Sequence, residues 1–133
     1  MWSVLKNYTD GALLFFRLTL GSFFIYLHGW PMLAGGLSKW RAIGGAMRHL
    51  GITLGPGFWG FVAAASESLG CLLFVIGFAF RPSCLMLFLT LTVAAISDYY
   101  SGGLHRADHA IEMALVFFTF MFIGAGKFSF DKG

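Results

Sequence analysis

The stretch Phe58–Phe80, FWGFVAAASESLGCLLFVIGFAF, decides the fold. It is long and apolar enough to cross a bilayer as a helix, because a helical span needs about 20 mostly apolar residues. Glu67 stands near its middle, and an ionisable residue at that depth is a candidate functional group. Small residues share its helical face and allow close approach of another helix, so we expect Glu67 to face the protein interior. This face comprises Gly60, Ala63, Ala64, Glu67, Gly70, Cys71, Phe74 and Gly77.

The composition predicts an integral membrane protein, with the lipid bilayer as its surroundings. Of the 133 residues 58% are hydrophobic and only 11% are charged, which leaves too little polar surface for a soluble domain of this size. The mean hydropathy is +0.78. The net charge of +3 is spread without a basic cluster, so we expect no nucleic-acid partner. Cys71 and Cys84 lack the spacing of a metal-binding or redox pair.

The hydropathy pattern predicts an all-α fold, an antiparallel four-helix transmembrane bundle in one membrane domain, residues 1–133. Trp30 and Pro31 are expected to close the first span, because proline ends or kinks a helix. The glycine-rich segment 34–57 is too polar to span, so it predicts either a short interfacial helix over the bundle mouth or a solvated linker. The four expected spans are 12–33, 57–80, 83–99 and 110–123.

Arg17 is the expected countercharge for Glu67. It lies on one helical stripe of the first span with Gly21, Phe24 and His28. We predict a buried ion pair between Arg17 and Glu67, closed by the long arginine side chain, by helix tilt or by a bridging water. Glu67 is then either a structural anchor or a group with a role in proton, ligand or redox chemistry.

Antiparallel spans also gather polar residues at one mouth of the bundle, with Glu67 below them. A cluster of histidines and carboxylates can bind a ligand or relay protons, because imidazole exchanges protons near neutral pH. Each member has a structural alternative, such as a packing histidine or a carboxylate at a helix start. We expect no metal, and we name Glu67 and His28 as candidate catalytic residues. The predicted mouth cluster is His28, Asp98, His105, His109 and Glu112.

Motifs along nearly the whole chain resemble the DoxX family of four-helix membrane proteins. The resemblance implies a bacterial-type cytoplasmic-membrane protein with a link to quinone chemistry, since members are similar to the small DoxD-type subunit of thiosulfate:quinone oxidoreductase. Others are associated with membrane oxidoreductase or redox-homeostasis complexes. The motifs are Arg17-Leu18-x-Leu20-Gly21 with His28-Gly29, Glu67-Ser68-x-Gly70 with Leu73, Gly77 and Arg81, Glu112-x-Ala114-Leu115, and Gly124-x-Gly126-Lys127-x-Ser129-Phe130-Asp131.

Two functions follow as hypotheses. In the first, the protein is a membrane subunit of a redox-linked complex, with a quinone or proton site around Glu67. In the second, it is a non-catalytic accessory subunit that anchors or stabilises a larger membrane complex. The sequence has no ligand set for haem, flavin or an iron–sulfur cluster, so we expect any electron carrier to belong to a partner. Partners are expected to be other membrane subunits or further copies of the chain, and both termini are expected in the cytoplasm.

Overall fold

The computed structural model describes residues 2–129, which contain helices and no strands. Met1 and residues 130–133, including Phe130 and Asp131 of the closing motif, lie outside the described residues. The elements are α1 (Trp2–Lys6), α2 (Thr9–Phe24), the π-helical turn η1 (Ile25–Gly29), α3 (Trp30–Ala34), α4 (Gly36–Gly44), the 3-10 helix η2 (Gly45–Leu50), α5 (Pro56–Ile76), α6 (Phe80–Gly102) and α7 (Leu104–Ile123).

Three helical segments of the described chain are long and apolar enough to cross a membrane: Thr9–Ala34, Pro56–Ile76 and Phe80–Gly102. The fourth long helix, α7, carries Arg106, Asp108 and Glu112 in its first half. The predicted all-α fold of a small helical membrane bundle is therefore confirmed. The last two helices are longer than the predicted segments, because both continue to a tight turn at Gly103.

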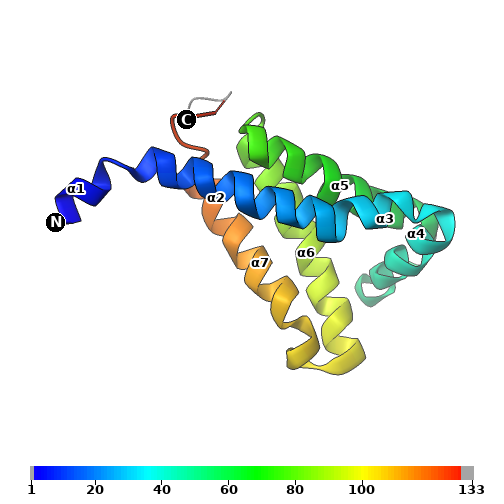
Figure 1. Ribbon diagram of the computed structural model, residues 1–133. Helices are drawn as coiled ribbons and strands as arrows, with labels where there is room; N and C mark the ends of the chain where they lie inside the picture. Colours follow the sequence, from blue (N-terminus) through cyan, green and yellow to red (C-terminus); the bar gives the residue numbers. More distant parts are fainter. Residues whose placement is uncertain (1, 130–133) are drawn as a thin grey trace.

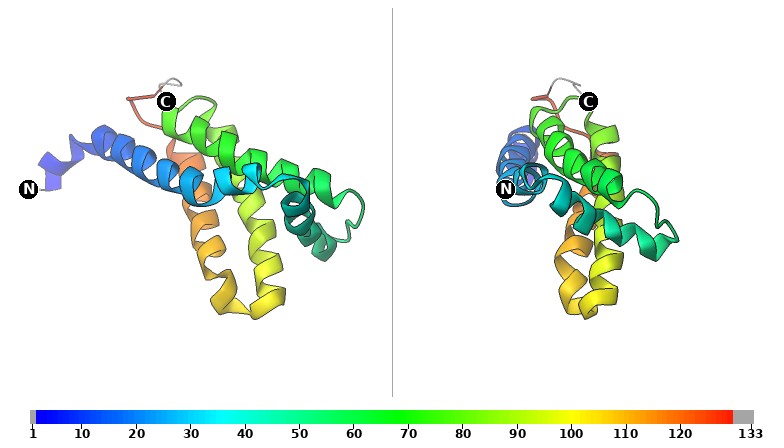
Figure 2. Two further views of the ribbon diagram at one scale, coloured as in Figure 1. Left: turned by 45° about the vertical axis from the view of Figure 1, so that its right-hand side comes forward. Right: turned by 90° about the vertical axis from the view of Figure 1, so that its right-hand side faces the viewer.

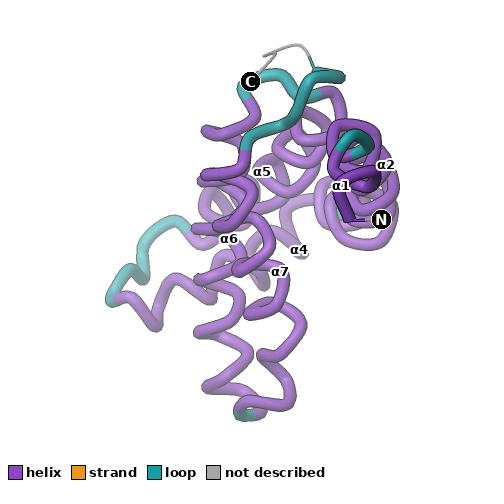
Figure 3. Tube along the Cα trace, turned by 90° about the vertical axis from the view of Figure 1, so that its left-hand side faces the viewer, coloured by secondary structure: helices purple, strands orange, loops and turns teal. Residues whose placement is uncertain are grey.

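The long helices pack as two antiparallel pairs (Figure 1). α2, η1 and α3 form one continuous rod that lies beside α5, and α6 and α7 form a hairpin inclined steeply to that rod. Figure 3 shows the same arrangement from the N-terminal side, with the C-terminal loop running over the ends of α2 and α5. The two pairs meet where α5 packs on α6.

The first helical segment ends at Ala34, close to the predicted end at 33, but Trp30 and Pro31 do not interrupt it, which corrects the prediction that this dipeptide closes the span. Helical structure continues to Ala34, and the turn before Pro31 is π-helical. The Trp30 N–H donates to the carbonyl of Ile25, five residues back. The wider turn offsets the hydrogen-bond ladder locally, so that a proline without an N–H fits within a continuous rod.

The segment between the first two spans forms α4 and η2, which matches the helical alternative. α4 packs on the start of α5 through two glycines, Gly44 and Gly60. A Cβ added at Gly44 would overlap the Pro56 carbonyl, and one added at Gly60 would overlap the Trp40 carbonyl. The two backbones are therefore in direct contact, which only small residues permit. Figure 2 shows this segment beside α6, on the side away from helix α7.

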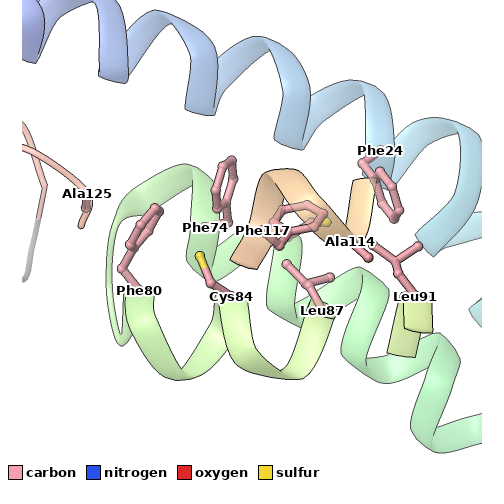
Figure 4. Close-up of a cluster of buried hydrophobic side chains, with 10 residues drawn as sticks. Phe24, Phe74, Phe80, Cys84, Leu87, Leu91, Ala114, Phe117 and Ala125 are labelled. Atoms are coloured by element: carbon pink, nitrogen blue, oxygen red, sulfur yellow. The ribbon is translucent and has the colours of Figure 1, made fainter. Parts of the chain in front are cut away.

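An aromatic cluster fills the junction of the two helix pairs (Figure 4). The ring of Phe74 stacks on Phe80 at 5.1 Å and meets Phe117 edge-on at 5.3 Å. Phe24 adds a further edge contact to Phe117 at 5.9 Å. Edge-to-face contacts hold aromatic pairs in defined orientations. The cluster therefore fixes the angle between the pairs and leaves open the space beyond Phe24, where the candidate site lies.

Candidate functional site

Glu67 lies at the middle of α5 and is 5% exposed, which confirms the prediction that it faces the protein interior. The other buried residues of α5, among them Gly60, Ala64 and Gly70, belong to the predicted set, with the exception of Ser66. Within residues 2–129, the carboxylate of Glu67 has no hydrogen-bond donor and no ion-pair partner. A buried carboxylate without a protein partner is costly unless a proton or a ligand satisfies it.

Arg17 does not pair with Glu67, which corrects the predicted ion pair. Arg17 is 1% exposed, and its guanidinium donates to four backbone carbonyls. The acceptors are Phe74 (3.2 Å), Val75 (2.8 Å), Ala125 (2.8 Å) and Phe128 (2.9 Å). Phe74 lies two helical turns after Glu67, about 10 Å along the axis. Arg17 therefore caps the end of α5 and ties the C-terminal loop to it, at a different depth from Glu67.

A cavity of about 710 Å³ opens beside Glu67. Residues of α2, η1, α3, α4, η2, α5, α6 and the first half of α7 line it, and most of the lining is apolar. The lining residues are Phe24, His28, Met32, Ala42, Ile43, Gly44, Ala46, Met47, Trp59, Val62, Ala63, Ser66, Glu67, Met86, Leu89, Thr90, Leu91, Val93, Ala94, Ser97, Asp98, His109 and Ala110.

Two histidines from distant helices meet in this cavity. The rings of His28 and His109 stack with centroids 5.2 Å apart. Gly29, next to His28, presses against α5, and a Cβ added there would lie 3.1 Å from the carbonyl carbon of Glu67. The backbone contact therefore brings the η1 turn, and His28 with it, to the depth of Glu67. The cavity joins the carboxylate and both imidazoles in one space.

The structure divides the predicted mouth cluster. His28, Asp98 and His109 line the cavity with Glu67, whereas His105 and Glu112 are exposed and lie outside it. The reason is helix rotation, because α7 turns Ala107, Ala110, Ala114 and Phe117 inward, and Glu112 lies on the opposite face. Asp98 also lies 3.9 Å from the guanidinium of Arg106, in an exposed ion pair.

The comparisons with known proteins identify the family. A family model for DoxX matches residues 12–99, which is more than half of the chain. The chain belongs to the DoxX family. Searches of curated proteins and of solved structures found no significant match. The matched region of this DoxX protein contains Arg17, His28, Glu67 and Asp98, whereas His109 comes from α7 beyond it.

Sequence reasoning assigned no role to three residues that line the DoxX cavity, Trp59, Ser66 and Met86. Ser66 is 4% exposed and next to Glu67, but the helical-face pattern did not include it. The signal that could have located the α6 wall is the helical spacing of the small and polar residues Thr90, Ala94 and Ser97. Trp59 gives no such signal, because an aromatic residue near a span end is also typical of the membrane interface.

The chemistry available in the cavity is that of hydrogen bonding and proton exchange. The carboxyl groups of Glu67 and Asp98, two imidazoles and three hydroxyls share an otherwise apolar space; the hydroxyls belong to Ser66, Thr90 and Ser97. In residues 2–129, no group of three or more His, Cys, Asp or Glu side chains is placed to hold a metal ion. Cys71 and Cys84 are buried free thiols in the aromatic core, outside the cavity lining.

Proposed function

We propose that this DoxX protein is a membrane subunit of a redox-linked complex and that the cavity around Glu67 holds the head group of a quinone. The observation that carries the proposal is the carboxylate of Glu67, which is 5% exposed, has no partner in the described residues and lines an apolar cavity of about 710 Å³. Pockets for small ligands and cofactors have volumes of about 300–1,000 Å³, with a few polar groups in an apolar wall. This cavity has that size and that lining.

The head group of a quinone matches the groups that the cavity offers. It is a flat ring with two carbonyl oxygens, which accept hydrogen bonds. Glu67 in its protonated form and the N–H groups of His28 and His109 are donors of that kind. The rings of Phe24 and Trp59 in the same wall supply flat apolar surface against which such a ring packs.

Reduction of the bound quinone takes two electrons and two protons and yields the quinol. In the proposal, the electrons come from the redox cofactor of a partner subunit, because DoxX-like chains are associated with such complexes. The protons pass from the mouth near Asp98 through His109, and Glu67 and His28 each donate one proton, to the two quinone oxygens. Each group then recovers its proton from the aqueous side.

Quinone reduction in membranes that contain the intact complex tests this function. Glu67→Gln is expected to lower the rate by roughly a hundredfold to ten-thousandfold, the contribution that a positioned proton-transfer group typically makes. Glu112→Gln is the matched control, because Glu112 is an exposed carboxylate outside the cavity. If both variants keep the wild-type rate at equal expression, the quinone site is excluded and the accessory role, which anchors a larger complex, becomes the better account.

The proposal places the protein in a bacterial-type cytoplasmic membrane with both termini in the cytoplasm. Cysteine labelling tests the orientation, because the native thiols of Cys71 and Cys84 are buried. Ser3 and Ser38 are exposed and lie on either side of the first span. A cysteine at Ser38 is expected to react with an impermeant reagent added outside, and one at Ser3 only after permeabilisation. The reverse pattern would invert the topology.

A further inference from the structure

We infer that the ligand reaches the cavity from the bilayer, through an opening beside Met86 and Leu89 of α6, and that the isoprenoid tail of a membrane quinone occupies this opening. The inference rests on the proposed function and adds the class of quinone and its path. The opening, called here the lipid portal, consists of Ile43, Met47, Met86, Leu89 and Val93, all of which line the cavity.

Residues of the lipid portal line the cavity and are also exposed on the outer surface of the protein. Met86 is 48% exposed and Leu89 is 54% exposed, although both line the cavity. Large apolar side chains that are half exposed on a membrane-spanning helix are in contact with lipid. The cavity is therefore separated from the hydrocarbon only by side chains that lie at its edge.

The depth of the portal agrees with access from the hydrocarbon region. Leu89 lies near the middle of α6, about 13 Å along the axis from Phe80, at 1.5 Å per residue. The hydrocarbon core of a bilayer is about 30 Å thick, so this level is well below the polar head groups. A cavity that opens there admits molecules that are dissolved in the membrane.

The other end of the cavity has a different chemistry. Asp98, which forms the exposed ion pair with Arg106, lies toward the far end of α6. Above this end η2 packs on α6, and the ring of His49 stacks on Tyr100 at 4.7 Å. The charged end is therefore suited to the passage of protons, and the lipid portal is suited to an apolar tail.

Methionines around the cavity suit a flexible tail. Met32, Met47 and Met86 line the cavity, three of the six methionines in the chain. Methionine side chains are unbranched and polarizable, so they repack around ligands of irregular shape. An isoprenoid tail is apolar and flexible, and it needs no polar partner along its length.

Photolabelling in proteoliposomes tests the portal, with two azidoquinones as probes. One carries a long isoprenoid tail and is incorporated in the lipid, and the other has no tail and is added from water. Leu89→Trp is expected to slow labelling by the long-tailed probe by roughly tenfold, because the larger side chain blocks the opening. Labelling by the tail-less probe is expected to change less than about twofold. Leu89→Ala is a second variant, expected to speed labelling by the long-tailed probe.

Leu85→Trp is the matched control. Leu85 lies one turn before Leu89 and is 42% exposed, but it does not line the cavity. Its substitution is expected to leave both probes unaffected. Equal behaviour of the Leu85 and Leu89 variants, with the wild type labelled, would overturn the portal and leave the quinone site in place. A wild-type protein that neither probe labels would overturn both the portal and the proposed function.

Discussion

His28 and His109 stack their imidazole rings 5.2 Å apart inside the cavity that holds Glu67. His28 comes from the π-helical turn of the first helix and also contacts Phe24, at 4.9 Å between ring centroids. His109 comes from α7, which begins beyond the matched family region. The pair therefore depends on the tertiary fold, and it puts two imidazole rings in the wall of the cavity that Glu67 also lines.

Replacement of His28 separates a chemical role from a packing role. His28→Gln is expected to cost about 1 kcal/mol of stability or less, because only a partly exposed ring contact is lost. The rate of quinone reduction is expected to fall by about tenfold or more, with a changed dependence on pH between about 5.5 and 8. The measurement is the rate in membranes at matched expression, beside thermal unfolding in detergent.

His105→Gln is the control for this experiment, because His105 is exposed and lies outside the cavity. It is expected to keep both the wild-type rate and the wild-type pH profile. If His28→Gln also keeps them, the two stacked rings are packing groups and the proposed proton path is wrong.

Arg17 is expected to be the most sensitive structural residue of the first helix. Arg17→Met removes the donor of four backbone carbonyls, of which Phe74 and Ala125 accept buried hydrogen bonds and Val75 and Phe128 accept partly buried ones. Since an unsatisfied buried polar group costs about 1–3 kcal/mol, we expect a loss of at least about 3 kcal/mol. Thermal unfolding in a mild detergent measures this loss. Arg81→Met, at an exposed position, is the control and is expected to change stability by less than about 0.5 kcal/mol.

Arg17 and Glu67 are expected to be energetically independent, because no contact joins them in the described residues. Glu67→Gln alone is expected to leave stability unchanged or to raise it, since an isolated buried carboxylate is costly. In a double-mutant cycle with Arg17→Met, the two effects are expected to add within about 0.5 kcal/mol. A coupling energy above about 1 kcal/mol would restore the ion pair that the sequence predicted.

The fold followed from the sequence because hydropathy and small-residue spacing act within single helices. The inward face of the second span, including Gly60, Gly70 and Glu67, was predicted apart from Ser66. Contacts between helices were harder to predict. Charge complementarity suggested Arg17 as the partner of Glu67, but Arg17 instead donates to carbonyls at the end of α5, which have no donor within the helix.

The candidate site could be predicted only in part. The antiparallel topology correctly brought His28, Asp98 and His109 to one end of the helices. Topology does not fix the rotation of a helix about its axis, so the exposed positions of His105 and Glu112 could not be foreseen. The continuation of the first helix through Pro31 depends on a π-helical turn, for which the sequence has no clear signal.

The contact between α4 and α5 closes one side of the cavity, and we expect this contact to require a glycine at position 44. A Cβ at Gly44 would overlap the Pro56 carbonyl and lie 2.6 Å from the Gly60 nitrogen. These are backbone atoms and cannot move aside, so Gly44→Ala is expected to cost about 1–3 kcal/mol. Gly45 is its neighbour, and a Cβ there meets nothing within 4 Å. Gly45→Ala is therefore expected to be neutral or slightly stabilising.

Limited trypsin digestion measures how firmly α4 and η2 are held, because Lys39, Arg41 and Arg48 are exposed cleavage sites within them. Gly44→Ala is expected to speed cleavage at these sites, since α4 can no longer pack on α5 and opens locally. Gly45→Ala is expected to be cleaved at the wild-type rate. If the two variants are cleaved alike, the glycine contact does not hold the segment, and the cavity wall formed by Ile43 and Met47 must be kept in place by the contact of His49 with Tyr100 instead.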